Sequence, residues 1–175
     1  MSDLSREPHL DAAAAAQKLA AALQQKKSDR VVFAESCTAG MVAALLGQIA
    51  GISNWHCGSA VTYRQSAKQQ WLDVSPATLE NYSAESLETT QEMAIGVLQK
   101  TDEATISAAV TGHLGPNAPT DIDGKIFVAL ARRVGDSIDI VATKEIKLAQ
   151  TKRAERQFEA ATIVLDTTRD QITVQ

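Results

Sequence analysis

Ser36 and Cys37 are two candidate nucleophiles that lie side by side in a short segment of small and polar residues. The segment, 34–40, follows the apolar run 31–33 and precedes an apolar stretch that begins at Met41. This order predicts a tight turn from a buried strand into a helix. Side chains in such a turn lie at the carboxyl end of a sheet, where open α/β sheets bind ligands. We therefore expect a reactive hydroxyl or thiol here, facing unpaired N–H groups of the first helical turn.

The sequence offers a base for either nucleophile. A serine hydroxyl needs a general base, and no Ser-His-Asp spacing is recognisable, so we favour Lys68, with Tyr63 relaying or orienting the proton. A lysine acts as a base only when burial or a neighbouring cation makes it neutral. Cys37 would instead be activated by the helix end, with His113 or His56 as its partner. The residue pattern alone does not separate the two nucleophiles.

A second candidate segment lies at 111–116, where Thr-Gly-His-Leu-Gly-Pro follows the apolar run 104–110. Glycines in such a loop let backbone N–H groups approach a phosphate or an oxyanion closely, although Gly and Pro also occur in ordinary loops. His113 with Asp121 and Asp123 gives no recognisable zinc or calcium spacing, so we predict no metal site.

Three basic residues lie close together near the start of the last predicted helix. Lys152, Arg153 and Arg156 could hold a substrate phosphate there, because the helix dipole favours an anion. A charged helical face exposed to solvent is the more common role for such a cluster.

Composition limits the class of protein. The chain has 175 residues, 45% hydrophobic and 22% charged, with a formal net charge of −4, which is typical of one globular domain. An acidic chain lacks the basic surface that binds a phosphate backbone, so we expect no nucleic-acid partner. No apolar stretch approaches about 20 residues and no signal peptide is recognisable, so we expect a cytoplasmic protein without membrane contact. Cys37 and Cys57 are expected to be free thiols.

The elements that position the candidate residues are predicted from the pattern of apolar residues. Residues 1–175 are expected to form one α/β domain, with 1–9 as a flexible tail. The predicted strands are 31–34, 59–63, 104–110, 125–131 and 137–148, the last two as a hairpin. The predicted helices are 12–27 with Asp11 as cap, 38–49, 66–72 with Ser66 as cap, a short turn from 75, 84–99 and 150–167. Tyr63 and Lys68 would then share one strand end.

Taken together, the motifs closely resemble the carboxy-terminal domain of the competence/damage-inducible CinA family. The resemblance covers about residues 10–168 and follows the family's order of motifs. It rests on Glu-Ser-Cys-Thr-Ala-Gly at 35–40, Gly-Ser-Ala-Val-Thr-Tyr at 58–63, Ala-Lys at 67–68 and Thr-Gly-His-Leu-Gly-Pro at 111–116, with Ala-Gly at 50–51 and Met93, Ala94 and Gly96 in addition.

The resemblance implies a three-layer α/β/α sandwich with a mixed, mostly parallel sheet of about five strands. It also implies the activity of the family's characterised members, which deamidate nicotinamide mononucleotide to nicotinate mononucleotide and ammonia. The family's catalytic serine, tyrosine and lysine fall on Ser36, Tyr63 and Lys68. The implied substrate-binding residues are Glu35, Cys37, Thr38, Thr111, Gly112, His113, Gly115 and Arg156, with Arg156 at the phosphate. No metal or cofactor is implied, the partner is a pyridine mononucleotide, and a homo-oligomer, preferably a dimer, is our default expectation.

This chain departs from the family pattern at the expected pocket wall. It has Ala39 in place of a glycine, His113 and Leu114 in place of an Ile-Ala pair, and Ala118 and Pro119 in place of two glycines. Lys152 stands in the aligned place of a basic residue one turn before Arg156. The alternative interpretation is therefore a non-enzymatic or differently specific member that binds a nucleotide-type ligand or a protein partner.

Overall fold

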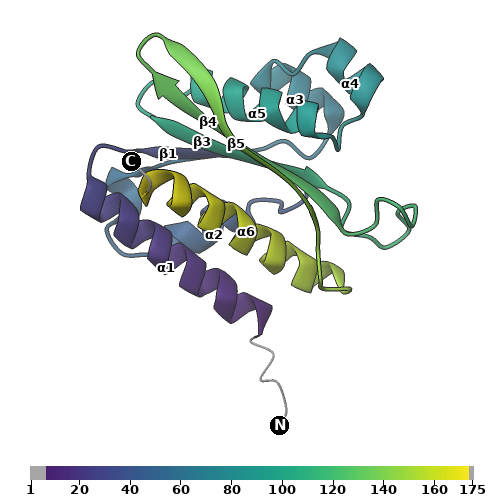
Figure 1. The fold of residues 1–175 in the computed structure, drawn as a ribbon, viewed down its shortest axis with the longest axis horizontal. Coiled ribbons are helices and arrows are strands. Elements are labelled where there is room, and N and C mark those ends of the chain that lie inside the picture. The colour runs from purple at the N-terminus through teal and green to yellow at the C-terminus, as the bar shows by residue number, and fades with distance from the viewer. Residues whose placement is uncertain (1–6, 174–175) are drawn as a thin grey trace.

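A five-stranded mixed sheet forms the centre of the molecule, and helices cover both of its faces (Figure 1). The computed structural model describes residues 7–173. The strands are β1 (Val31–Glu35), β2 (His56–Val61), β3 (Ile106–Gly112), β4 (Lys125–Val134) and β5 (Ser137–Lys147), in the order β2-β1-β3-β4-β5. β1 pairs in parallel with β2 and β3, whereas β4 is antiparallel to β3 and β5. The predicted hairpin and the three-layer α/β architecture are thus confirmed.

The helices form two layers. One layer contains α1 (Pro8–Lys26), α2 (Met41–Gly47) and α6 (Arg153–Thr173), and the other contains α3 (Gln65–Leu72), α4 (Pro76–Tyr82) and α5 (Leu87–Gln99). A short 3₁₀ helix, Ile52–Asn54, leads into β2. Successive residues of a strand point to opposite faces, so Phe33 packs with the first layer and Val32 with the second. The inner strands are apolar on both faces, as a sheet covered on both sides requires.

Several helices begin elsewhere than the sequence predicts. α1 begins at Pro8 with Glu7 as its N-cap, so Asp11, predicted as the cap, lies inside the first turn. Residues 8 and 9 therefore belong to this helix, and residues 1–6 of the expected tail lie outside the described residues. α3 has Arg64 as its N-cap, so Ser66 lies within the helix. A proline at the first helical position is well tolerated, which explains the earlier start of α1.

Gly96 fixes the position of α3 against α5. A Cβ atom at Gly96 would lie 2.0 Å from the carbonyl oxygen of Leu72, the last residue of α3. Only a glycine allows this close approach of the two backbones. The contact matters for the site, because α3 also carries Lys68.

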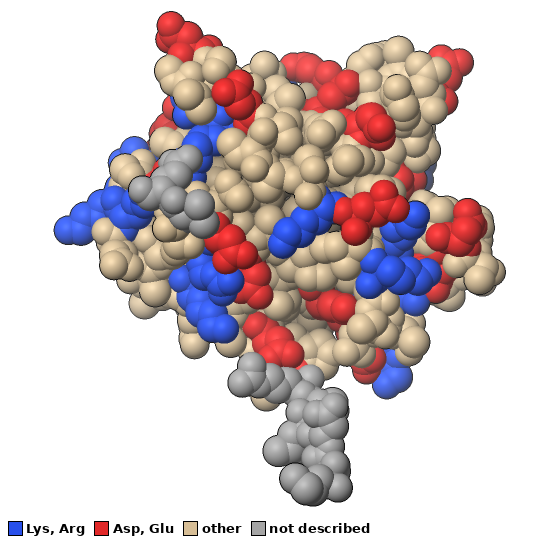
Figure 2. Space-filling model, viewed as in Figure 1, with Lys and Arg blue, Asp and Glu red and all other residues tan. Residues whose placement is uncertain are grey.

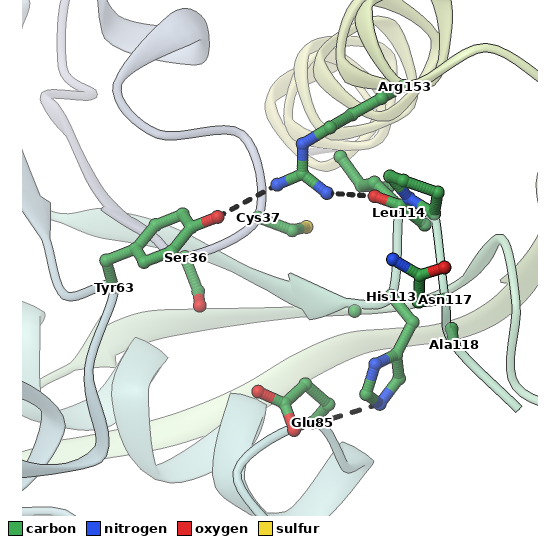
Figure 3. Close-up of a pocket in the computed structure, with 12 residues that line it drawn as sticks. Ser36, Cys37, Tyr63, Glu85, His113, Leu114, Asn117, Ala118 and Arg153 are labelled. Carbon is green, nitrogen blue, oxygen red and sulfur yellow. Dashed lines mark hydrogen bonds and ion pairs between the residues drawn. The ribbon is translucent and has the colours of Figure 1, made fainter.

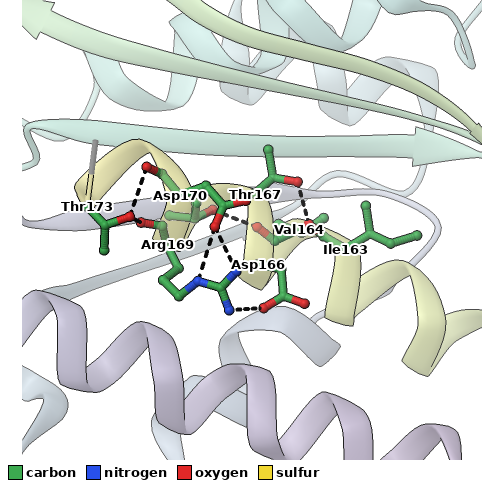
Figure 4. A network of polar contacts seen from close by, with 8 residues as sticks. Ile163, Val164, Asp166, Thr167, Arg169, Asp170 and Thr173 are labelled. Atoms are coloured by element: carbon green, nitrogen blue, oxygen red, sulfur yellow. Dashed lines mark hydrogen bonds and ion pairs between the residues drawn. The ribbon is translucent and has the colours of Figure 1, made fainter. Parts of the chain in front are cut away.

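Ion pairs lie at the end of the molecule where β1 begins. The buried Arg132 Nη1 lies 2.7 Å from Asp29 Oδ1, and near the end of α6 Arg169 pairs with Asp166 and Asp170 (Figure 4). The pairs of Arg169 are partly exposed and contribute little, about 0–1 kcal/mol each. These contacts are structural, because the candidate residues lie at the other end of β1.

The surface in Figure 2 carries acidic and basic side chains interspersed among neutral ones. Among the helices of the described chain, none is long and apolar enough to cross a membrane.

Candidate active site

Ser36 and Lys68 meet in the interior of the protein. Ser36 follows the end of β1, and the Nζ atom of Lys68 donates a hydrogen bond of 2.9 Å to its Oγ atom and one of 3.2 Å to the carbonyl oxygen of Thr62. Lys68 is 0% exposed. Burial lowers the pKa of Lys68 below the ordinary lysine value, while the nearby Glu85 carboxylate acts in the opposite direction. A lowered pKa increases the neutral fraction, which a lysine needs in order to act as a base.

Glu35 determines the shape of the turn that carries Ser36. Its buried carboxylate accepts five hydrogen bonds of 2.8 to 3.0 Å, from the Thr38 hydroxyl, the Ser59 hydroxyl and the backbone N–H groups of Gly40, Val42 and Ala43. The backbone N–H groups at the start of α2 therefore already donate to a carboxylate of the chain itself. The helix dipole also favours a negative charge at this end of the helix. The expectation that these N–H groups are unpaired is wrong.

Two residues of the same turn adopt left-handed backbone conformations. Ala39 has φ 53° and Gly40 has φ 95°. These conformations let the chain reverse before α2 begins at Met41, three residues later than predicted. The left-handed conformation costs about 1–2 kcal/mol for a residue with a side chain, and a glycine avoids this cost. The alanine at position 39 is therefore a strained substitution for the glycine of the family pattern.

A cavity of about 250 Å³ opens beside Ser36 (Figure 3). Ser36, Cys37 and Tyr63 line it from the strand ends, and the segment 112–118 lines it from the other side. Figure 3 shows the Arg153 guanidinium on one side of the cavity, the Glu85 carboxylate on the other, and the Ser36 hydroxyl between them. The structure thus gathers residues from the end of β3, the start of α6, the loops that follow β1, β2 and β3, and the loop before α5 around one hydroxyl group.

Tyr63 lines this cavity, but its hydroxyl is bonded to Arg153. Its hydroxyl accepts a hydrogen bond of 2.8 Å from Arg153 Nη2, and Arg153 Nη1 donates to the carbonyl oxygen of Gly115. Within residues 7–173, no hydrogen bond joins the Tyr63 hydroxyl to Ser36 or Lys68. The predicted direct relay through Tyr63 is therefore not formed in this structure, and Tyr63 is instead held by Arg153.

Arg156 occupies a different position from the one predicted. Its guanidinium donates two hydrogen bonds of 2.8 Å to Asp123 and one of 2.7 Å to the carbonyl oxygen of Gln150. These bonds hold the loop between β3 and β4, part of which lines the cavity. The loop packs closely on the guanidinium, since Cβ atoms at Gly115 or Gly124 would lie 3.0 Å from it. The predicted phosphate ligand is thus already paired with a carboxylate. The pairing of Arg156 with Asp123 follows from the packing of the loop that carries Asp123 against α6, which the sequence does not show.

Arg153 is the arginine that faces the cavity. It is exposed, and it also lines an adjoining cavity of about 530 Å³ together with Lys152 and Arg156. Lys152, which directly precedes α6, is exposed, and its Nζ atom lies 3.0 Å from the Glu155 carboxylate. The sequence analysis included Arg153 in the basic cluster but gave no reason to prefer it to Arg156. Which of the two arginines faces the cavity depends on how the helix packs, and the sequence does not show this.

Cys37 also lines the cavity, but its chemistry is unfavourable for a nucleophile. Burial raises the pKa of the Cys37 thiol to about 12. A thiol with such a pKa is protonated at neutral pH, and the thiolate is the reactive form. The structure therefore favours Ser36 over Cys37, which the sequence left undecided.

Two further predicted binding residues lie behind the cavity wall. The Thr38 hydroxyl donates to Glu35, and the buried Thr111 hydroxyl lies 2.8 Å from that of Thr90. Neither threonine lines the cavity. Together with Glu35 they position the residues that line the cavity.

The segment 112–118 brings the remaining predicted residues to the cavity. Gly112 is required there, because a Cβ atom would lie 2.5 Å from the carbonyl oxygen of Lys125. The His113 ring lies 3.8 Å from the Glu85 carboxylate (Figure 3). Glu85 was missed by the sequence analysis, and no sequence signal marks it, since it merely precedes the N-cap Ser86 of α5. Residues 7–173 contain no cluster of three or more His, Cys, Asp or Glu side chains that could hold a metal ion.

The sequence is similar to those of known proteins. The model of the CinA C-terminal domain family matches residues 12–172. A CinA-like protein of Desulfosudis oleivorans is 37% identical over 141 residues, which are 79% of this chain and 33% of that protein. The nicotinamide-nucleotide amidohydrolase PncC of Enterobacter agglomerans is 44% identical over 87 residues, 50% of this chain and 52% of PncC.

A solved structure shows the same fold over nearly the whole chain. The CinA superfamily protein KP700603 of Klebsiella pneumoniae 700603 has a TM-score of 0.83 and 26% identity, and the match covers 94% of this chain and 99% of that one. In contrast, the chain spans about a quarter to a third of the length of the CinA-like and competence-damage relatives that it matches. The family match over residues 12–172 leads to one conclusion: the chain belongs to the CinA C-terminal domain family.

Proposed function

We propose that this protein is a serine-type amidohydrolase that deamidates nicotinamide mononucleotide to nicotinate mononucleotide and ammonia. The observation that carries the proposal is the hydrogen bond of 2.9 Å between the buried Lys68 Nζ atom and the Ser36 Oγ atom at the edge of a cavity. A relative named nicotinamide-nucleotide amidohydrolase supports the choice of substrate.

In the first half of the proposed reaction, neutral Lys68 takes the proton of the Ser36 hydroxyl. The Oγ atom then forms a bond to the carboxamide carbon, and the resulting tetrahedral intermediate carries its negative charge on oxygen. The protonated Lys68 returns the proton to the carboxamide nitrogen. The C–N bond breaks, ammonia leaves, and an acyl ester remains on Ser36.

In the second half, a water molecule attacks the acyl carbon while Lys68 accepts one of its protons. The bond between the acyl carbon and Ser36 Oγ breaks, and the proton passes from Lys68 to Ser36. The carboxylic acid product leaves and gives its remaining proton to the released ammonia, so that carboxylate and ammonium form. The sum is one carboxamide and one water converted to one carboxylate with ammonium, and the enzyme is unchanged.

Backbone N–H groups of the turn could stabilise the intermediate. The N–H groups of Gly40, Val42 and Ala43 are bonded to Glu35, and that of Ser36 is bonded to the Val110 carbonyl oxygen at 3.1 Å. Within the described residues, the N–H group of Thr38 has no acceptor, and that of Cys37 has none beyond its own side chain. They are the donors that we assign to the oxyanion, since such donors stabilise developing charge.

Arg153 is the residue that we assign to the substrate phosphate. It is exposed and lies between the cavity beside Ser36 and the adjoining cavity, whereas the guanidinium of Arg156 is already paired with Asp123. An arginine can bind phosphate oxygens through two parallel hydrogen bonds. In this arrangement the carboxamide lies at Ser36 and the ribose phosphate extends toward α6.

The test is ammonia release from nicotinamide mononucleotide by the purified chain. We expect the wild type to release ammonia, the Ser36→Ala variant to lose at least about 10³-fold in rate, and the Cys37→Ala variant to stay within about threefold of the wild type, because its thiol is not ionised. No ammonia above the Ser36→Ala background would refute the deamidase proposal. Loss of turnover in Cys37→Ala with retention in Ser36→Ala would instead identify a cysteine hydrolase.

A further inference from the structure

Glu85 places a negative charge inside the cavity beside Ser36. Its side chain is 30% exposed and lines the cavity. Its one ion-pair partner among the described residues is His113, whose Nε2 atom lies 3.8 Å from the nearer carboxylate oxygen, beyond normal hydrogen-bond length. The carboxylate therefore keeps free capacity to interact with a ligand.

The backbone around Glu85 is held firmly in place. The Ser83 carbonyl oxygen accepts hydrogen bonds from the Ser86 and Thr89 hydroxyls, and the Thr90 hydroxyl donates to the Ser86 carbonyl oxygen at 2.6 Å. Thr90 in turn contacts Thr111 at the end of β3. The start of α5 is thus tied to the strand that leads to His113.

His113 is held just as firmly on the opposite wall. Its N–H donates 2.9 Å to the Lys125 carbonyl oxygen, and its own carbonyl oxygen accepts 2.7 Å from the Gly124 N–H. Hydrogen bonds within the chain therefore fix the backbone from which the Glu85 and His113 side chains extend. Preorganised charges of this kind cost little reorganisation on binding.

The two ends of the cavity carry opposite charges. Arg153 is the cation toward α6, and Glu85 is the anion at the other side of Ser36 (Figure 3). A complementary ligand has an anionic group at one end and a cationic group near its scissile carboxamide. A pyridinium mononucleotide has this distribution, since its ring nitrogen is quaternary and positively charged and its phosphate is negative.

We propose that Glu85, positioned beside His113, is a specificity-determining residue that selects carboxamide ligands with a positive charge in the ring that bears the carboxamide. This inference rests on the proposed function, because it takes the same cavity as the substrate site. It predicts discrimination between the oxidised nucleotide, whose ring is a cation, and the reduced dihydropyridine nucleotide, whose ring is neutral.

The experiment measures dissociation constants by calorimetry in the Ser36→Ala background, where turnover does not interfere. The ligands are nicotinamide mononucleotide and its reduced form, which differ chiefly in ring charge. With Glu85 present we expect the cationic ring to bind about tenfold more tightly than the neutral one, and with Glu85→Gln we expect this ratio to fall to about one. Glu80→Gln, at an exposed position of α4, is the matched control and should leave the ratio unchanged.

Two further arms isolate the charge of Glu85. The Glu85→Asp variant keeps the charge and should retain a preference for the cation. Because Glu85 also acts on the ionisation of Lys68, the measurement is repeated in a Lys68→Met background, where the ratio should again depend on Glu85. Nicotinamide and 1-methylnicotinamide provide the same neutral and cationic pair without the phosphate.

The outcomes separate this inference from the proposed function. A protein that shows no preference for the cationic ligand, or the same preference after Glu85→Gln, overturns the role of Glu85 even if the wild type releases ammonia. A preference that disappears in Glu85→Gln supports it, even if the wild type hydrolyses neither nucleotide. In the latter case the proposed deamidase activity fails and the charge selectivity of the site stands.

Discussion

The buried residues around Ser36 and the charged residues that face the cavity, Glu85, His113 and Arg153, are held by different kinds of interaction. On the Ser36 side, a buried carboxylate with five hydrogen bonds and a buried lysine fix the turn. In contrast, Glu85, His113 and Arg153 are partly or largely exposed and make few contacts. The comparison indicates that the residues of the proposed chemistry are built into the core, whereas those of the proposed ligand selection are side chains that can change without disturbing the fold.

The departures from the family pattern follow this division. His113 and Ala118 line the cavity, and Leu114 is buried at its edge. The carbonyl oxygen of Pro119 accepts hydrogen bonds from the N–H groups of Ile122 and Asp123, so it forms the turn that presents Asp123 to Arg156. Ala39 is the exception, since it lies on the Ser36 side and takes a left-handed conformation there.

The largest expected effect is that of Lys68→Met, which removes the proposed base. Ammonia release should fall by at least about 10³-fold, as for loss of a residue in other catalytic units. The folded pKa of Lys68 lies below its unfolded value, so the folded protein binds fewer protons between these two pKa values. The free energy of unfolding of the wild type should therefore rise with pH across that window, and this contribution should be absent from the variant.

Chemical denaturation at several pH values measures this difference. Lys18→Met, at an exposed position of α1, is the control and should change neither activity nor the pH dependence of stability. A Lys68→Met variant that still turns over substrate would show that the buried side of the cavity does not carry the chemistry.

The next largest effect is expected for Glu35→Gln. A glutamine keeps one acceptor oxygen but turns an NH₂ group toward donors that the carboxylate now satisfies, so we expect a loss of about 2–3 kcal/mol in the free energy of unfolding. Activity should also fall because the turn positions Ser36. Urea denaturation measures the loss, with Glu80→Gln as a control that should change stability by less than about 0.5 kcal/mol. An equal effect of the two variants would contradict the structural role of Glu35.

The smallest expected effect is that of Ala39→Gly, which should stabilise the protein by about 0.5–1 kcal/mol. A glycine removes the strain of the left-handed conformation, and the greater entropy of glycine in the unfolded chain offsets only part of this gain. The control is Ala43→Gly, within the regular helix α2, which should destabilise by about 1 kcal/mol. Thermal denaturation of both variants gives the sign directly. Destabilisation by Ala39→Gly would mean that the strain at position 39 is already compensated.

The sequence by itself determined the order of strands and helices along the chain and the position of the strand-to-helix turn that carries Ser36. Apolar runs such as 104–110 and the helical spacing of small residues depend on neighbours along the chain, so they could be interpreted without the fold. The pairing of Ser36 with Lys68 was also anticipated, through the motifs that resemble the CinA family. Exact helix starts were not, because caps such as Glu7 and Arg64 depend on local backbone geometry.

Only the tertiary structure decided which charged side chains face the cavity. Glu35 was expected to bind substrate, but it caps α2, and Arg156 was expected at the phosphate, but it is bonded to Asp123, 33 residues away. Glu85 faces the cavity from the loop before α5 and Arg153 from the start of α6, and these two helices pack on opposite faces of the sheet. Contacts between residues so distant in sequence are set by packing and by the satisfaction of buried charges, and neither leaves a local pattern in the sequence.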